Sequence, residues 1–319
     1  MVAASRDTGS RDAKVTQPES LRQANHPSYG LSARPLPLQY AVRAVPLKGH
    51  AADINPTKGT AMTPLIHLYL LASGSKGNAA VVEGPQGSVL VDCGISRREL
   101  HRRADLAECD LSRVCAMLVT HEHGDHTSGL SVLSKHFDGP IYATAGTADA
   151  RSHLSRLPFT PMPHDGTLEL GGMHVQAFPL SHDVVDPMCF RFEVRQDGAV
   201  VDAVGWATDT GVLTKEAELA LHGCRTLGIE SNHDEVMLAN GPYPYYLRVR
   251  VGGSHGHLSN AQAAKALPKL MTDETETVVG MHVSEKNNRP DLVLKSLEVA
   301  VAGQAKVLVA SQTEPLVIW

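Results

Sequence analysis

Short apolar runs alternate with longer segments of mixed polarity from about residue 64 onward. The apolar runs are rich in Val, Ile and Leu and are bounded by Gly, Pro, Asp or Asn, which is typical of strands. The predicted strands are 65–71, 79–83, 88–91, 116–120, 140–143, 173–178, 189–194, 200–207, 226–230, 277–282 and 305–310. The predicted helices are 96–107, 128–137, 146–155, 212–222, 259–271 and 290–300. Because a cluster of strands precedes strands that alternate with helices, the pattern predicts an α/β fold with sheets inside and helices outside.

The first 61 residues lack this pattern. Residues 1–61 are rich in Pro, Ser, Ala and Arg, a composition that predicts a disordered N-terminal extension. The segment lacks the apolar core of a secretory signal, and a transit peptide is the alternative. Met62 directly precedes the first predicted strand, so we interpret Met62 as the biological start and residues 1–61 as a start-site artefact. Residues 62–319 are then expected to form one domain.

Composition limits the class of protein. The chain is 42% apolar and 20% charged, which fits a globular protein, and no apolar run reaches the ~18–20 residues of a membrane span. The five Cys have no paired spacing, so we expect a reducing, cytoplasmic location. Residues 62–319 hold 21 basic and 30 acidic residues, a net charge of −9 against −5 for the whole chain. This balance does not provide the basic surface that duplex nucleic-acid binders often carry.

Three His and one Asp are concentrated in the segment Thr120-His121-Glu122-His123-Gly124-Asp125-His126. It lies between a predicted strand and a predicted helix, in a loop where side chains can converge. His121 and His123 are two residues apart and can point to the same side of an extended segment. Gly124 can turn the chain toward Asp125 and His126. Imidazole and carboxylate groups bind Zn²⁺ and similar ions, so the spacing predicts a metal site; the alternative is a His-rich surface loop.

Further candidate ligands each follow a predicted strand: His182, Asp209 and His282. One His or Asp at a strand end is more often structural, but three after such a motif indicate a shared site. Together with the loop they give seven candidate ligands, enough for two metal ions that share a bridging carboxylate and a water.

On these residues the chain resembles the metallo-β-lactamase superfamily over essentially all of residues 64–319. More narrowly, it resembles the YycJ-like (WalJ) branch of that superfamily. The stretches that carry the narrower resemblance are 72–78 (ASGSKGN), 230–234 (ESNHD), 256–260 (GHLSN) and 282–288 (HVSEKNN). The resemblance implies an αββα sandwich, two mixed sheets flanked by helices, with a dinuclear metal centre at the sheet edges. It also implies phosphodiester hydrolysis, since members of this branch are similar to DNA exonucleases linked to repair.

The resemblance also implies a role for each ligand. The first metal would be held by His121, His123 and His182. The second would be held by Asp125, His126 and His282, with Asp209 bridging. We expect Zn²⁺, with Mn²⁺ or Fe²⁺ as alternatives.

Asp125 and three residues outside the ligand set are candidates for catalytic roles. Asp92 matches an early strand-end Asp of the superfamily and would orient ligands or the bridging water; the alternative is a turn-capping Asp. His257 would donate a hydrogen bond or a proton to a phosphate oxygen or leaving group. His233 would be a ligand or a phosphate contact. Both histidines have a purely structural role as the alternative.

The predicted activity is a metal-dependent phosphodiesterase, most simply an exonuclease acting on DNA rather than RNA, in which a metal-bridged hydroxide attacks phosphorus. The alternative is a thioester (glyoxalase-type) or other small-molecule hydrolase on the same site. A non-catalytic metal sensor gains no support, since no flavin-binding segment follows the metal motif.

Two other segments are open to more than one interpretation. Residues 73–77 resemble a phosphate-binding loop, but a strand-like run follows them, so a turn between the first two strands is favoured. Residues 241–250, with Tyr243, Tyr245, Tyr246, Arg248 and Arg250, are either a base-stacking surface or a Pro-rich surface loop.

Overall fold

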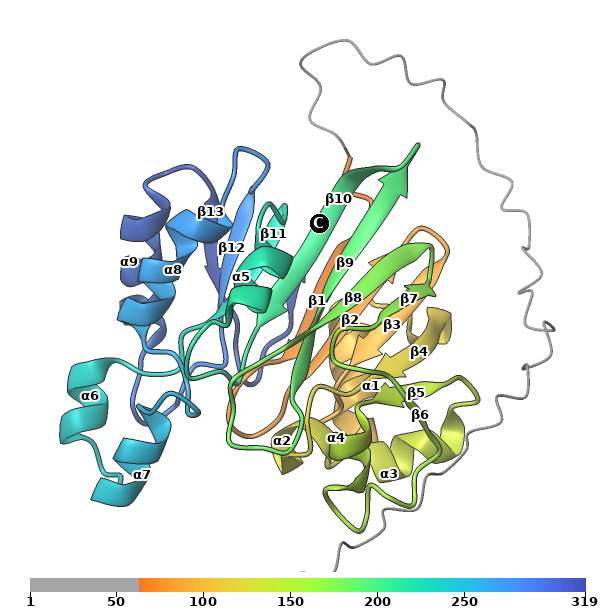
Figure 1. The fold of residues 1–319 in the computed structure, drawn as a ribbon, viewed down its shortest axis with the longest axis horizontal. Helices are drawn as coiled ribbons and strands as arrows, with labels where there is room; N and C mark the ends of the chain where they lie inside the picture. The colour runs from red at the N-terminus through yellow and green to blue at the C-terminus, as the bar shows by residue number, and fades with distance from the viewer. Residues whose placement is uncertain (1–62) are drawn as a thin grey trace, which may run out of the picture. The chain divides into compact units, whose positions relative to one another are not determined.

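The computed structural model describes residues 63–319, in which two seven-stranded sheets pack against each other and helices cover their outer faces (Figure 1). The predicted αββα sandwich is therefore confirmed. The predicted extension 1–61 and the start at Met62 lie outside the described residues. The first sheet contains β1 (His67–Ala72), β2 (Ala79–Gly84), β3 (Gly87–Val91), β4 (Val114–Leu118), β5 (Ile141–Ala143), β6 (Phe159–Pro161) and β14 (Leu316–Ile318). The second contains β7 (Thr167–Leu170), β8 (Met173–Pro179), β9 (Met188–Gln196), β10 (Ala199–Ala207), β11 (Thr226–Glu230), β12 (Thr277–Met281) and β13 (Lys306–Val309).

Both sheets are half antiparallel and half parallel. In the first sheet, β14, β1, β2 and β3 pair antiparallel, and β3, β4, β5 and β6 pair parallel. In the second, β13, β12, β11 and β10 pair parallel, and β10, β9, β8 and β7 pair antiparallel. Parallel neighbours place their carboxyl ends at one edge of a sheet, which is where ligands bind in open α/β sheets.

Strands β1, β2 and β3 of the first sheet are buried on both faces. Leu68 and Leu70 of β1 face the core between the two sheets, whereas Tyr69 and Leu71 face a second apolar cluster that includes Leu100 of the covering helix. This two-sided burial explains why the strands are continuous apolar runs rather than alternating ones.

Helices lie outside the sheets, and several of them begin at a side-chain cap. They are α1 (Arg97–Leu106), α2 (Gly124–Thr127), α3 (Leu130–Leu133), α4 (Ala145–Asp149), α5 (Lys215–Leu221), α6 (Glu235–Asn240), α7 (Tyr245–Val251), α8 (Asn260–Leu270) and α9 (Pro290–Val301), with short 3₁₀ turns at Leu111–Arg113 and Ser134–His136. Ser96, Thr214 and Ser259 accept hydrogen bonds from backbone amides of α1, α5 and α8. No helix in residues 63–319 combines the length and the apolar character that crossing a bilayer requires.

The sequence-based elements differ from the structure in several places. The predicted helix 146–155 is wrong beyond Asp149, where α4 ends, and α6 was not predicted. The predicted helix 128–137 is interrupted, because α2 ends at Thr127 and the chain then forms α3 and a 3₁₀ turn. The short strands β6, β7 and β14 were not predicted. Residues 241–250 are not a loop throughout, since α7 begins after Pro244, a residue that is compatible with a helix start because its missing N–H is not needed there. Figure 1 shows α6 and α7 projecting from the sandwich beside its lower edge.

Candidate metal centre

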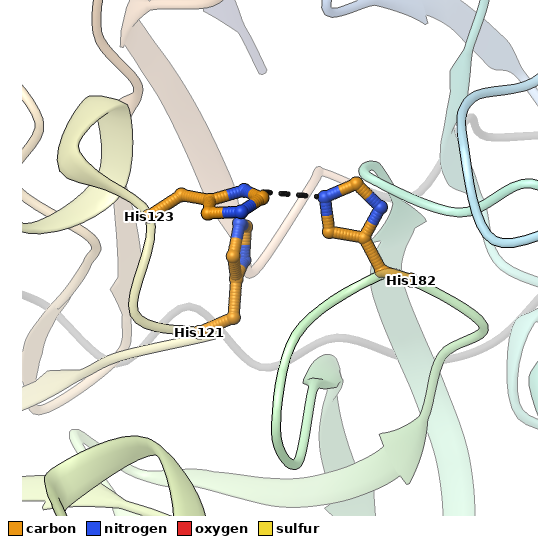
Figure 2. A group of neighbouring side chains, drawn as sticks. All are labelled: His121, His123 and His182. Atoms are coloured by element: carbon orange, nitrogen blue, oxygen red, sulfur yellow. Dashed lines mark hydrogen bonds between the residues drawn. The ribbon is translucent and has the colours of Figure 1, made fainter. Parts of the chain in front are cut away.

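Three histidines from two separate loops converge at the edge of the sandwich. His121 and His123 follow β4, and His182 follows β8. Figure 2 shows their rings pointing toward one another, with His123 Nδ1 at 3.3 Å from His182 Nε2. One ring nitrogen of each residue lies within 4.8 Å of the others, a spacing that would place one metal ion among them.

A second cluster lies beside the first and consists of Asp125, His126, Asp209 and His282. Asp209 contacts both clusters. Its Oδ2 lies 3.1 Å from His126 Nε2, and its Oδ1 lies 3.5 Å from His282 Nε2 and 3.9 Å from His182 Nε2. The two sets of residues that the sequence predicted as metal ligands are thus adjacent and share one carboxylate.

The histidines present free nitrogens to these clusters because their other nitrogens are already engaged. His182 Nδ1 donates to Gly256 O at 3.1 Å, and His121 Nδ1 lies 3.0 Å from Thr120 Oγ1. His121 Nε2 and His282 Nε2 are buried and have no hydrogen-bond partner in residues 63–319. Buried polar atoms without partners are rare in native proteins, and a divalent ion would satisfy both of them. The donor set therefore fits a dinuclear metal site.

The protonation preferences agree with this fit for the first cluster and for Asp209. In the second cluster, burial would lower the pKa of His126 and of His282, but Asp209 raises it, so metal binding there would release protons. Burial and the neighbouring histidines hold the pKa of His121 well below its ordinary value, and burial also lowers the pKa of His123 and His182. Burial opposes ionisation of Asp209, but His282 and His126 lower its pKa well below its ordinary value. Neutral imidazoles and an ionised carboxylate are the forms that bind metal.

Asp92 holds the motif loop in place. It follows β3, is buried, and accepts hydrogen bonds from Thr120 N and Thr120 Oγ1, both at 2.8 Å. The same carboxylate lies 2.7 Å from His126 Nδ1, so His126 directs Nε2 toward Asp209. Asp92 therefore contacts the candidate ligand His126 on the side of the ring opposite Asp209.

Glu230 is the counterpart of Asp92 in the second sheet, and sequence reasoning did not identify it as a site residue. It ends β11, is fully buried, and its Oε1 accepts from His257 Nδ1 at 2.7 Å and lies 3.0 Å from His282 Nδ1. Its Oε2 accepts from Thr210 N at 2.9 Å. Burial would lower the pKa of His257, but Glu230 raises it above its ordinary value. A lone Glu at the end of an otherwise apolar strand was the available signal.

Residues 73–78 also contribute to the site. This segment is the predicted turn between β1 and β2, yet Ser73 Oγ accepts from His282 N at 2.9 Å, and Asn78 Nδ2 lies 3.0 Å from His126 Nε2. On the other side, Glu122 Oε1 accepts from Val185 N at 2.9 Å, which ties the motif loop to the loop that carries His182. Glu122 is thus an anchor between the two loops.

A cavity of about 180 Å³ opens beside the two clusters. Its wall includes His257, whose ring centroid is 5.2 Å from that of His282, together with Tyr243 and Arg250 of the α7 region. Arg250 forms an ion pair with Asp183, the residue after His182. His233 does not join either cluster; it is buried and lines a separate groove.

Three residues of the site have an unusual backbone. Asp92, Asp209 and His282 have φ angles of 59°, 57° and 54°. This left-handed conformation is uncommon for residues other than Gly, although Asp tolerates it better than most. All three residues follow strands, so the left-handed turn occurs where the chain leaves the sheet and enters the site.

Comparison with known proteins identifies relatives along most of the chain. The model of the β-lactamase superfamily domain matches residues 88–283. The exodeoxyribonuclease YycJ of Bacillus anthracis is 34% identical over 240 residues, which cover 73% of this chain and 88% of that protein. The exodeoxyribonuclease WalJ of Streptococcus pneumoniae serotype 2 is 31% identical over 231 residues, 70% of this chain and 83% of that protein.

Solved structures share the fold. The metallo-β-lactamase fold protein YhfI of Bacillus subtilis superposes with a TM-score of 0.59 at 15% identity, covering 79% of this chain and 99% of that one. The short form of human tRNase Z superposes with a TM-score of 0.52 at 18% identity, covering 79% of this chain and 98% of that one.

Proposed function

Because the chain belongs to the metallo-β-lactamase superfamily, we propose that it is a dinuclear-metal-dependent phosphodiesterase that degrades DNA as an exonuclease. The observation that carries this proposal is the position of Asp209, whose carboxylate contacts the cluster of His182 on one side and that of His126 and His282 on the other. Two ions held by these two clusters would polarise the phosphate and lower the pKa of a bound water to near neutrality.

The division of ligands that the family resemblance implies is part of this proposal. His121, His123 and His182 would hold one ion, and Asp125, His126 and His282 would hold the other, with Asp209 shared between them. Asp92 fixes the ring of His126 through Nδ1, and Glu230 fixes the ring of His282 in the same way. These two carboxylates keep the ligand nitrogens aimed at the cluster.

His257 acts on the leaving group. Its Nδ1 donates a hydrogen bond to Glu230, so Nε2 is the ring nitrogen that remains for proton transfer. The ring lines the cavity. A proton held there can be transferred to the oxygen that departs when the phosphodiester breaks. No protein nucleophile is required, and Cys93 is buried with burial raising the pKa of its thiol to about 12.

DNA is the proposed substrate because the relatives at 34% and 31% identity are named exodeoxyribonucleases. Zn²⁺ is the proposed ion, because a ligand set with four or more imidazole nitrogens suits it. We also propose that this activity serves DNA repair in the cytoplasm. A thioester hydrolase on the same ligands is the competing activity, to be separated by experiment.

The experiment uses the purified full-length chain. Metal content is measured first, and then hydrolysis of single-stranded and duplex DNA labelled at one end, of bis(p-nitrophenyl) phosphate, and of a glutathione thioester. Asp125→Ala is assayed beside the wild type. We expect about two bound ions per chain, metal-dependent release of nucleotides from DNA ends, and no activity in the variant.

Two results would contradict the proposal. Thioester cleavage without DNA cleavage would assign the site to the competing activity. Full DNA cleavage by Asp125→Ala would remove the ligand set from the mechanism.

A further inference from the structure

The helical arm, which comprises α6, α7 and the turn between them (residues 235–251), separates two hollows of the surface. Leu247, Arg250 and Val251 of α7 line the cavity of the metal centre. Tyr245, Arg248 and Val249 of the same helix line a second groove of about 480 Å³, which we call the outer groove. Figure 1 shows the arm projecting beside the edge of the sandwich. The helix α7 therefore contributes side chains to both the metal cavity and the outer groove.

The residues that line the outer groove include an exposed aromatic side chain, a buried apolar side chain and a buried polar side chain. The Tyr245 side chain is 76% exposed, whereas Leu238 is buried beneath it in α6. His233 lines the groove, is only 3% exposed, and its Nδ1 has no hydrogen-bond partner in residues 63–319. A flat heterocycle with ring nitrogens and carbonyl groups matches these surfaces, because it can stack on the phenol ring and hydrogen-bond to polar atoms at its edge.

Charge does not oppose a nucleic acid in this groove, whose charged lining residues are Glu235 and Arg248. The helix α7 contains Arg248 and Arg250 and no acidic residue, although residues 62–319 carry a net charge of −9. Glu235 also lines the groove, but its Oε1 accepts from Ser259 Oγ at 2.9 Å. Arg248 donates to Ala239 O of α6, which holds the two helices against each other. The arm, with two basic residues and one acidic residue, is thus an aromatic surface that is less acidic than the rest of the domain.

The position of the groove relative to the metal centre fits one continuous strand. A helix with its side chains is about 10 Å across, so a strand that passes α7 would span roughly three stacked nucleotides between the two hollows. We propose that the outer groove is a second substrate subsite, which binds an unpaired nucleobase of the strand whose terminal phosphodiester lies at the metal centre. This inference rests on the proposed function and adds a substrate preference to it: a single-stranded end.

Two adjacent tyrosines provide the test. Tyr245 and Tyr246 are 76% and 73% exposed, but only Tyr245 lines the groove. Tyr245→Ala and the matched control Tyr246→Ala are made in the full-length chain, and KM and kcat are measured for a single-stranded oligonucleotide and for bis(p-nitrophenyl) phosphate. For Tyr245→Ala we expect KM for the oligonucleotide to rise about five- to a hundredfold, the range expected when one base loses its stacking partner. We expect kcat, the small reporter and the Tyr246→Ala control to stay near the wild type.

A second measurement locates the base. One abasic nucleotide is moved along the oligonucleotide, and KM is measured at each position. The wild type should show one sensitive position about three nucleotides from the scissile end, and Tyr245→Ala should show none.

The outcomes distinguish this inference from the function on which it rests. Equal KM values for Tyr245→Ala and Tyr246→Ala, or equal sensitivity at every abasic position, would overturn the base-binding groove while leaving the nuclease intact. Absence of DNA cleavage by the wild type would overturn the proposed function itself, and the substrate subsite with it.

Discussion

Each sheet supplies one buried carboxylate that supports a histidine of the metal centre, and the two carboxylates differ in their second partner. Asp92 in the first sheet contacts His126 and also holds Thr120, whose hydroxyl lies beside Nδ1 of the candidate ligand His121. Glu230 in the second sheet contacts His282 and also holds His257, whose ring lines the cavity. The first half of the site is therefore arranged to hold metal. The second half holds metal and also presents a group able to transfer a proton.

The largest expected effect comes from Asp209, which belongs to both halves. In Asp209→Asn the carboxylate that contacts both clusters is lost, and two ions would no longer be held at a shared position. A metal pair contributes several kcal/mol to transition-state stabilisation, so we expect DNA hydrolysis to fall about a thousandfold or more. Metal content by mass spectrometry and the hydrolysis rate check this; a variant with both ions and normal activity would contradict the bridging role.

Glu230→Gln and Asp92→Asn test the difference between the two halves directly. Both changes weaken the support of one ligand histidine, for which we expect metal affinity to fall about 10- to 100-fold. Saturating metal should restore most activity to Asp92→Asn. It should not do so for Glu230→Gln, because His257 also loses the carboxylate that orients it. Activity is titrated against metal for both variants, and equal recovery would show that the two carboxylates have the same role.

His257→Ala separates proton transfer from metal binding. Metal content should stay at the wild-type level, and DNA hydrolysis should fall about 10²- to 10⁴-fold, the usual contribution of a general acid. Hydrolysis of bis(p-nitrophenyl) phosphate should fall much less, because p-nitrophenolate leaves without needing a proton. Equal losses for the two substrates would assign His257 to structure rather than to the leaving group.

The smallest effect is expected for Glu122, which ties the two loops of the first cluster together. In Glu122→Gln the hydrogen bond from Val185 N is weakened but an acceptor oxygen remains. A single hydrogen bond is worth about 1 kcal/mol, so we expect metal affinity and activity to change by about fivefold or less. Calorimetric titration of metal into the variant measures this, and a loss as large as that of Asp92→Asn would show that the first half depends on two carboxylates.

The sequence predicted the half of the site that is contiguous in the chain better than the half that is not. His121, His123, Asp125 and His126 occupy one loop, so their spacing alone indicated a metal site. The ligands of the second sheet come singly from the ends of different strands, and three of these residues were identified because each follows an apolar run. Glu230 was missed as a site residue because its own strand is apolar and nothing in the sequence shows that two histidines meet its carboxylate.

Side-chain direction was the other limit. Asn232 lines the metal cavity, whereas the next residue, His233, lines the outer groove, because neighbouring residues of an extended chain face opposite ways. From the sequence, His233 was a candidate site residue and Asn232 was not. The helix α7 escaped prediction for a related reason: Leu247-Arg248-Val249-Arg250-Val251 alternates as a strand would, and two prolines precede it.

The left-handed backbone of Asp92, Asp209 and His282 has a consequence for how the protein would change under selection. Each such residue costs on the order of 1 kcal/mol, a cost that Gly at the same position would largely avoid. The geometry that serves catalysis is therefore not the geometry that would make the fold most durable. A random library screened only for heat resistance is expected to accumulate Gly at Asp209 and His282 rather than at Asp92, whose buried carboxylate holds Thr120, and the most robust clones would be the ones that had lost their chemistry.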